Sequence, residues 1–159
     1  MERFLNTASF LEGTDALGAA WLAEAGLAPA GRALGEDDRL RLVDLREALR
    51  AVLVDHHDPE AAAALDRLGR GAPLVVAWGE DGSARLVPAA DGVARVVAKL
   101  LSIVAHAQAA GTWTRLKACA SESCRWAFYD DTRNRSRNWC SMRVCGNRAK
   151  ARSYRARQR

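Results

Sequence analysis

Four cysteines in the last part of the chain form a pattern that can hold a metal ion. They form two pairs of the type Cys-x4-Cys with fifteen residues between the pairs, and the preceding 118 residues contain no cysteine. Each pair can turn two thiolates toward one ion, and the intervening loop can bring the pairs together. The spacing therefore predicts one structural zinc ion, Zn2+, per chain, held by Cys119, Cys124, Cys140 and Cys145.

Two disulfides, four ordinary buried thiols and an iron–sulfur cluster are the alternatives to zinc. The four-residue spacing lies at the edge of the range that structural zinc sites use. Disulfides need an oxidising compartment, whereas the start of the chain has an early acid, Glu2, and lacks the apolar run of a signal peptide. Four thiolates also suit iron, so that alternative stays open. A site with four thiolates has no open coordination position, so we expect the metal to hold structure rather than to catalyse a reaction.

The second cysteine pair leads directly into a strongly basic segment. Residues 111–159 contain 13 Lys and Arg against 3 Asp and Glu, whereas residues 1–110 contain 11 against 16. Such a split is typical of a nucleic-acid-binding end attached to a different kind of domain, although a basic tail can also serve only solubility. In a helix, Arg148, Arg152 and Arg155 would share one face. The predicted nucleic-acid contacts are Arg133, Arg135, Arg137, Arg143, Asn147, Arg148, Lys150, Arg152 and Arg155.

The tryptophans and one tyrosine offer a second kind of contact surface. Trp126 and Tyr129 could stack on bases, as exposed aromatic residues do in single-strand binders. An aromatic residue between two cysteine pairs belongs more often to a small core, so we expect both to be buried, together with Trp139. We also expect Trp21 and Trp78 to belong to the core of the preceding domain, although they could instead line a ligand pocket.

The rest of the chain must position the basic unit, and its patterns predict four helices and one β-hairpin. Apolar residues recur at three- and four-residue steps within the predicted helices. Asp58 followed by Pro59 is typical of a helix start, and Thr14 or Asp15 can cap the first helix. An Asp-Gly turn between two strand-like runs predicts the hairpin. The predicted helices span residues 16–26, 36–55, 60–68 and 92–110, and the predicted strands span 74–78 and 84–88.

These patterns predict an α+β fold that is mostly α and has two parts. Residues 1–111 form a helical domain with one β-hairpin, and residues 112–159 form a small treble-clef-like zinc-binding domain. In the second part, residues 125–130 form a strand, 131–138 form a polar loop, and a basic helix starts near Gly146. No run of eighteen apolar residues occurs, so we expect a soluble, cytoplasmic protein without a membrane span.

Two stretches of the chain resemble known domain families. The run Trp139-Cys140-Ser141-Met142, then Cys145-Gly146-Asn147-Arg148, with Tyr129-Asp130 upstream, closely resembles the CGNR zinc finger. The N-terminal Phe4-Leu5-Asn6-Thr7, followed by a Trp-Leu helix and a Leu-Arg-Glu-Ala-Leu-Arg helix, resembles the ABATE domain that usually precedes this finger. The resemblance implies a bacterial, stress-induced transcription regulator. It also implies zinc on the four cysteines and DNA contact near Asn147, Arg148 and the basic helix.

The residues of the Cys-Gly-Asn-Arg motif also have physical roles of their own. Gly146 allows a tight backbone beside the metal, and Asn147 can cap the following helix. Arg148 can contact phosphate, or it can neutralise the negative charge of the zinc centre. The sequence leaves both roles of Arg148 open.

The chain shows no arrangement of residues typical of an active site. Its three histidines are His56, His57 and His106, and no glycine-rich phosphate loop is present, so we expect no enzymatic activity. The leading hypothesis is a regulator that binds duplex DNA. An RNA-binding accessory protein and a zinc-stapled protein-interaction module are the alternatives. The N-terminal domain would sense a signal through a small-molecule effector or form a homodimer.

Overall fold

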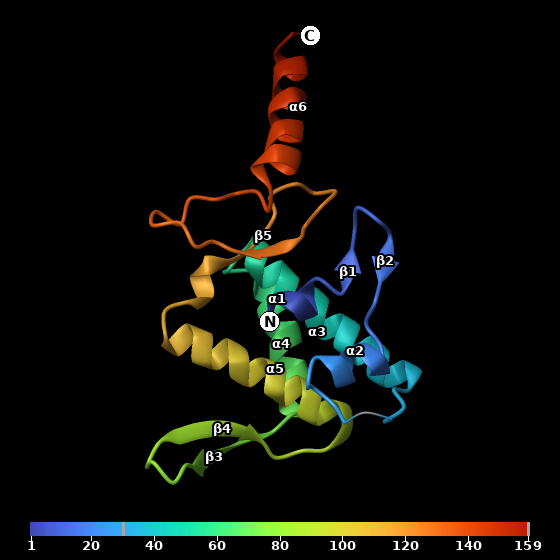
Figure 1. Cartoon of the computed structure of the whole chain (residues 1–159), viewed down its shortest axis with the longest axis vertical. Helices are drawn as coiled ribbons and strands as arrows, with labels where there is room; N and C mark the ends of the chain where they lie inside the picture. Colours follow the sequence, from blue (N-terminus) through green and yellow to red (C-terminus); the bar gives the residue numbers. More distant parts are fainter. Residues whose placement is uncertain (30, 159) are drawn as a thin grey trace.

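The computed structural model describes residues 1–29 and 31–158 of the chain, and helices dominate it (Figure 1). The α-helices are α1 (Glu2–Leu5), α2 (Ala19–Glu24), α3 (Glu36–Val54), α4 (Pro59–Arg70), α5 (Gly92–Ala109) and α6 (Asn147–Arg157). The strands are β1 (Ala8–Ser9), β2 (Thr14–Asp15), β3 (Leu74–Trp78), β4 (Ala84–Pro88), β5 (Leu116–Ala118) and β6 (Ala127–Tyr129). A 3-10 turn, η1 (Trp113–Arg115), and a π-helical turn, η2 (Met142–Gly146), complete the elements. This arrangement confirms the α+β fold.

The strands pair as three separate antiparallel ribbons rather than as one sheet. The ribbons are β1–β2, β3–β4 and β5–β6. The predicted hairpin is confirmed: Val76 pairs with Leu86 at the centre of its register. Its turn contains Gly82 with φ +75°, a backbone conformation that glycine adopts without strain.

Helices α3 and α4 form where the sequence predicts them. Helix α3 begins with three acidic residues at its positive end, and its apolar face is buried through Leu42, Leu45 and Leu49. The Asp58 side chain accepts hydrogen bonds from two backbone N–H groups in the first turn of α4, while Pro59 occupies the first helical position. Apolar periodicity and the acidic first turn therefore explain α3, and capping by Asp58 explains the start of α4.

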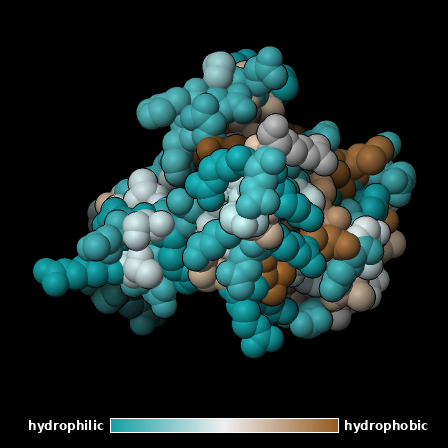
Figure 2. Space-filling model, turned by 90° about the horizontal axis from the view of Figure 1, so that it is seen from above, coloured by the Kyte–Doolittle hydropathy of each residue, from teal (hydrophilic) through white to brown (hydrophobic). Residues whose placement is uncertain are grey.

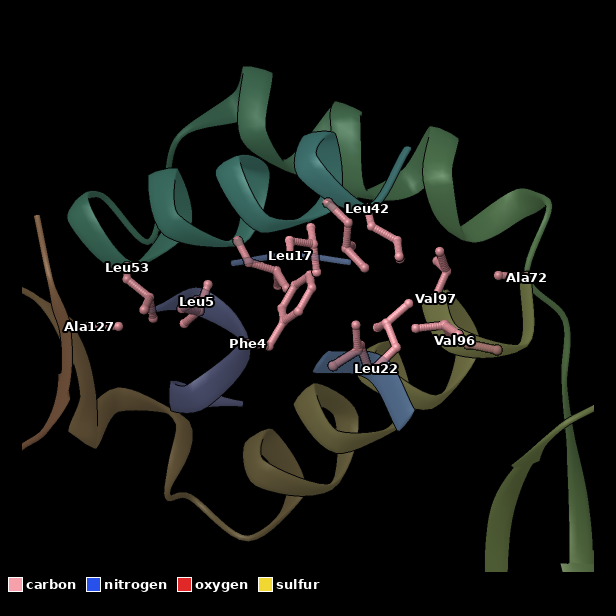
Figure 3. Close-up of a cluster of buried hydrophobic side chains, with 14 of the residues drawn as sticks. Phe4, Leu5, Leu17, Leu22, Leu42, Leu53, Ala72, Val96, Val97 and Ala127 are labelled. Atoms are coloured by element: carbon pink, nitrogen blue, oxygen red, sulfur yellow. The ribbon is translucent and has the colours of Figure 1, made fainter. Parts of the chain in front are cut away.

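The hydrophobic core lies between α3 and α5 and continues into the cysteine-rich part of the chain. Figure 3 shows Phe4 and Leu5 of α1 and Leu22 of α2 pointing into the space between the two long helices. Ala127 of β6 closes the same cluster beside Leu5 and Leu53. Because β6 contributes to the core of the helical domain, the two parts of the chain pack against each other directly.

The first residues of the chain depart from the sequence prediction. Thr14 and Asp15 do not cap a helix; they form β2, and α2 begins only at Ala19. The Asp15 carboxylate instead accepts two hydrogen bonds from the Arg46 guanidinium, at 2.8 and 3.0 Å. Burial alone would raise the pKa of Asp15, but these bonds lower it. Asp15 also accepts from the Leu17 N–H at 3.0 Å, so it joins a local turn to a partner 31 residues away and does not cap a helix.

Trp78 contradicts the prediction of a core tryptophan. It lies at the end of β3 with 73% of its surface exposed, so the hairpin carries it outside the core. Trp21 is half-buried and packs against Phe4, with 6.2 Å between the ring centroids. The prediction is thus confirmed for Trp21 and wrong for Trp78.

Among the described residues, α5 is the single helix whose length and composition would allow it to cross a membrane. The core helix of a globular protein has the same properties. In this fold Val96, Val97 and Leu100 of α5 are buried against the other helices.

Arg50 is fully buried and joins α3 to the two segments that meet it. Its guanidinium donates to the carbonyl oxygens of Leu5 and, at 2.6 Å, of Arg125, which follows the first cysteine pair. Its Nε lies 3.3 Å from the Glu47 carboxylate. Burial lowers the pKa of Arg50, and the nearby Glu47 opposes this effect. One side chain thus connects the N-terminus, α3 and the cysteine-rich part.

Asn6 forms a second connection, because its side chain pairs with the backbone of β6. Its amide nitrogen donates to the carbonyl of Ala127 and its amide oxygen accepts from the Ala127 N–H, both at 2.8 Å. This reciprocal pair reproduces the hydrogen bonding of a neighbouring strand. The exposed edge of the β5–β6 ribbon is therefore satisfied by a residue of the N-terminal segment.

We predict that Arg50→Met destabilises the whole chain. The buried carbonyl oxygen of Leu5 and the partly buried one of Arg125 would lose their donor, which should cost about 2–4 kcal/mol. Urea unfolding followed by circular dichroism measures this loss. Arg67→Met, at an exposed position of α4, serves as the matched control and should change the free energy of unfolding by less than about 0.5 kcal/mol. Equal effects of the two substitutions would contradict the role assigned to Arg50.

Candidate metal centre and basic surface

The four cysteine thiols lie together as a tetrahedral metal site requires. All four Sγ atoms are within 4.8 Å of one another, and Cys140 Sγ is 3.7 Å from Cys124 Sγ and 3.8 Å from Cys145 Sγ. Zinc–sulfur bonds of about 2.3 Å in a tetrahedron place the sulfurs about 3.8 Å apart. A disulfide would need about 2.05 Å. The donor set therefore fits one zinc ion and not two disulfides.

The first cysteine pair lies on a tight turn after β5. The N–H groups of Cys124 and Arg125 both donate to the carbonyl of Ser121, at 2.8 and 3.0 Å. Arg125 has φ +48°, an uncommon conformation for a residue with a side chain. The Cys119 N–H donates to the Trp126 carbonyl at 2.9 Å and closes the turn. Buried Arg50 binds the carbonyl of Arg125 from the other side, which supports this conformation.

The second cysteine pair lies on the π-helical turn η2. Ser141 caps this turn, because its hydroxyl accepts from the Val144 N–H and its carbonyl accepts from the Cys145 and Gly146 N–H groups. A Cβ on Gly146 would lie 2.4 Å from the sulfur of Met142, whose side chain is half exposed and can move aside. Gly146 itself has ordinary helical backbone, with φ −63° and ψ −45°, so the predicted tight backbone is not seen there.

Asn147 does not act as the predicted helix cap. Helical backbone already begins at Met142, so Asn147 lies in a continuous turn, and its side chain donates to the Arg143 carbonyl at 3.1 Å. Ser141 takes the capping role instead. The sequence pattern missed this because the chain enters α6 through a π-helical turn, for which local spacing carries no clear signal.

Burial and neighbouring groups shift the pKa values of Cys119, Cys140 and Cys145 in different directions. Burial and the neighbouring Cys124 thiol raise the pKa of Cys140, and they raise the pKa of Cys145 to about 11. Burial also opposes ionisation of Cys119, but hydrogen bonds from the backbone of Cys140 and Ser121 lower its pKa. A bound cation favours the thiolate form of every ligand, so metal binding must displace protons from this site.

Buried Asp130 organises the polar loop between the two cysteine pairs. It accepts hydrogen bonds from Lys117 Nζ at 2.8 Å, from the Thr132 hydroxyl at 2.6 Å and from the Arg137 N–H at 2.9 Å. Burial alone would raise the pKa of Asp130, but these donors bring it well below its usual range. Lys117 also donates to the carbonyls of Arg135 and Arg137. The loop is therefore held in one conformation.

The predicted nucleic-acid contacts lie on one end of the molecule, around the cysteine cluster. Figure 2 looks onto this end, where hydrophilic side chains cover most of the surface. Eight of the nine predicted residues are exposed, namely Arg133, Arg135, Arg143, Asn147, Arg148, Lys150, Arg152 and Arg155. Arg137 is half-buried: it donates to the Cys140 carbonyl at 3.1 Å and lies over the Phe128 ring at 5.1 Å. Contact with nucleic acid stays a prediction for all nine.

The aromatic residues near the cysteines differ from the prediction. Trp126 and Tyr129 are 36% and 43% exposed and border a groove beside the thiols, so they are not core residues. Trp139 packs against the cysteine cluster as predicted.

Several residues that shape the site were absent from the sequence prediction. Asn6, Arg50 and Lys117 each act on a segment far away in the chain. Asp130 and Asn6 lie within the short motifs that carry the family resemblance. That resemblance was the one signal in the sequence that pointed to these two residues.

We predict that zinc affinity falls steeply as pH falls. If at least Cys140 and Cys145 lose protons on binding, the association constant should drop about 100-fold when pH falls by one unit near neutrality. Competition with a chromogenic chelator at two pH values measures this slope. Cys140→Ser provides the comparison, because it removes one of the displaced protons and should make the slope shallower. An affinity independent of pH would contradict the prediction.

Two family models together match almost the whole chain. Residues 115–158 match the family model described as CGNR zinc finger, and residues 3–115 match the ABATE model, described as "Putative stress-induced transcription regulator". A search of curated proteins found no match. The zinc-finger match and the clustered thiols together identify one structural zinc ion as the cofactor. The chain therefore belongs to the ABATE family and carries a C-terminal CGNR zinc finger.

Proposed function

We propose that this protein is a bacterial, cytoplasmic transcription regulator that binds duplex DNA through its zinc finger. The observation that supports this proposal best is the isolated basic helix α6. It carries five Lys and Arg residues and no acidic residue, and none of its residues is buried. Phosphate binding is the function that such a surface serves most directly.

The zinc site supports the proposal because it fixes the orientation of the basic groups. Helix α6 continues directly from Cys145, so its first turn is held by the metal. The loop bearing Arg133 and Arg135 is held by Asp130 and Lys117. Both segments border the cysteine cluster, so their charges can act on one stretch of DNA backbone. Preorganised charges lose less conformational entropy on binding than the charges of a flexible tail.

We propose that the helical domain performs the regulatory role. We assign residues 1–111 to sensing a signal, through a small-molecule effector or through homodimer formation, and residues 112–159 to DNA. One finger contacts a short site, and a dimer would double the contact area. Arg50 and Asn6 provide the physical link between the two parts. This role requires no reaction chemistry, so we propose a non-enzymatic regulator.

A salt titration with random duplex DNA tests the proposal. At least five phosphate contacts should give a log–log slope of affinity against salt of about −4.5 or steeper. Arg133→Ala/Arg143→Ala removes two exposed charges and should make the slope shallower by about 1.8. Arg67→Ala/Arg70→Ala removes the same charge from α4, away from the finger, and should leave the slope unchanged.

The other outcomes separate the two alternative functions. Tighter binding of single-stranded or duplex RNA than of duplex DNA would indicate an RNA-binding accessory protein. Zinc-loaded protein without salt-dependent binding to any nucleic acid would indicate a protein-interaction module, for which exposed Trp126 and Tyr129 offer a contact surface.

A further inference from the structure

The basic side chains of α6 are not confined to the one face that Arg148, Arg152 and Arg155 share. At about 100° per residue, Arg148, Arg152 and Arg155 lie on one flank of the helix. Lys150 and Arg157 lie on the opposite flank, roughly 180° away. The five cationic groups of α6 therefore form two rows along opposite sides of the helix.

Two different strips separate these basic flanks. One strip carries the small side chains of Ala149, Ser153 and Ala156. The other carries Asn147, Ala151 and Tyr154, with Gln158 following the helix and donating to the Tyr154 hydroxyl at 2.6 Å. Ala149 is the one half-buried residue of α6, so the small strip faces the finger at its start. The strip with Asn147 and Tyr154 therefore points away from the finger.

The surroundings of α6 leave both flanks open. The helix projects alone from the top of the molecule in Figure 1, and the finger holds it through η2 at its N-terminal end. A helix that lies on a flat surface needs charge on one face only. Positive charge on both flanks of a helix suits binding in a groove that has negative charge on both sides.

We infer that α6 enters the major groove of duplex DNA lengthwise, with its two basic flanks on the phosphates of the two strands. This inference rests on the proposed DNA binding and adds its geometry. The 11 residues of α6 span about 16 Å, or about five base pairs. The major groove is about 12 Å wide and admits a helix of this diameter.

The outward strip then faces the base edges and contains the residues that determine sequence preference. Asn147 and Tyr154 carry hydrogen-bonding groups on this strip, and an asparagine amide can bind adenine through two hydrogen bonds. Ala151 lies between them and lets the helix approach the bases closely. The major groove of duplex RNA is too narrow for the same contact, so the geometry distinguishes DNA from duplex RNA.

The test compares the salt slopes of two double variants of the full-length, zinc-loaded protein on random duplex DNA. Lys150→Ala/Arg157→Ala removes both positive charges from one flank of α6. Arg148→Ala/Arg155→Ala removes two of the three positive charges from the other flank. Alanine preserves helix propensity, so each variant should keep its helix. Each should make the slope shallower by about 1.8 relative to the parent protein. Arg67→Ala/Arg70→Ala on α4 is the charge-matched control and should keep the parent slope.

The outcomes distinguish this inference from the proposed function. If only Arg148→Ala/Arg155→Ala changes the slope, α6 lies on the DNA by one face and the inference is wrong while DNA binding stands. The same conclusion follows if neither variant changes it. Failure of the parent protein to bind DNA would overturn both. Duplex RNA of the same sequence should bind at least about tenfold more weakly than DNA, and equal binding would contradict major-groove insertion.

Discussion

The convergence of four thiolates on one ion is the constraint on which the C-terminal part of this protein depends. The β5–β6 ribbon has only three residues per strand, and α6 has no buried residue, so neither has enough packing to be stable alone. Zinc connects the turn after β5 to the turn before α6. The negative zinc–thiolate centre also lies at the N-terminal end of α6, where the helix dipole favours negative charge.

The metal-bound unit nevertheless packs directly against the helical domain. Trp113, Leu116 and Ala127 belong to the same hydrophobic cluster as α1, α3 and α5. Arg50 and Asn6 add hydrogen bonds from the N-terminal segments to the backbone of the finger. A change in the position of α1 or α3 would therefore act on the first cysteine pair through a few short contacts. This provides a physical route by which a structural change in the ABATE domain can reach the zinc finger.

Within the finger, the charged side chains that hold the structure together are more buried than the predicted nucleic-acid contacts. Asp130 and Lys117 hydrogen-bond to each other and hold the polar loop between the two cysteine pairs. Arg137 donates to the Cys140 carbonyl and lies over the Phe128 ring. Arg115 also donates to the Asp130 and Thr132 carbonyls, whereas Arg133, Arg135, Arg143 and the cationic residues of α6 are exposed. A count of basic residues along the chain cannot make this distinction, because Arg133 and Arg137 look alike in sequence while only one is free to reach a phosphate.

The sequence by itself determined the features that depend on residues close together in the chain. Cysteine spacing predicted the metal site, apolar periodicity predicted α3 and α5, the Asp58-Pro59 start predicted α4, and the Asp-Gly turn predicted the hairpin. Tertiary structure decided where Asp15, Arg50 and Trp78 lie. Asp15 pairs with Arg46 instead of capping a helix, Arg50 is buried although charged, and Trp78 is exposed although aromatic. Each of these outcomes depends on whether a distant segment of the chain packs against the residue. Such long-range packing leaves no periodic signal in the local sequence.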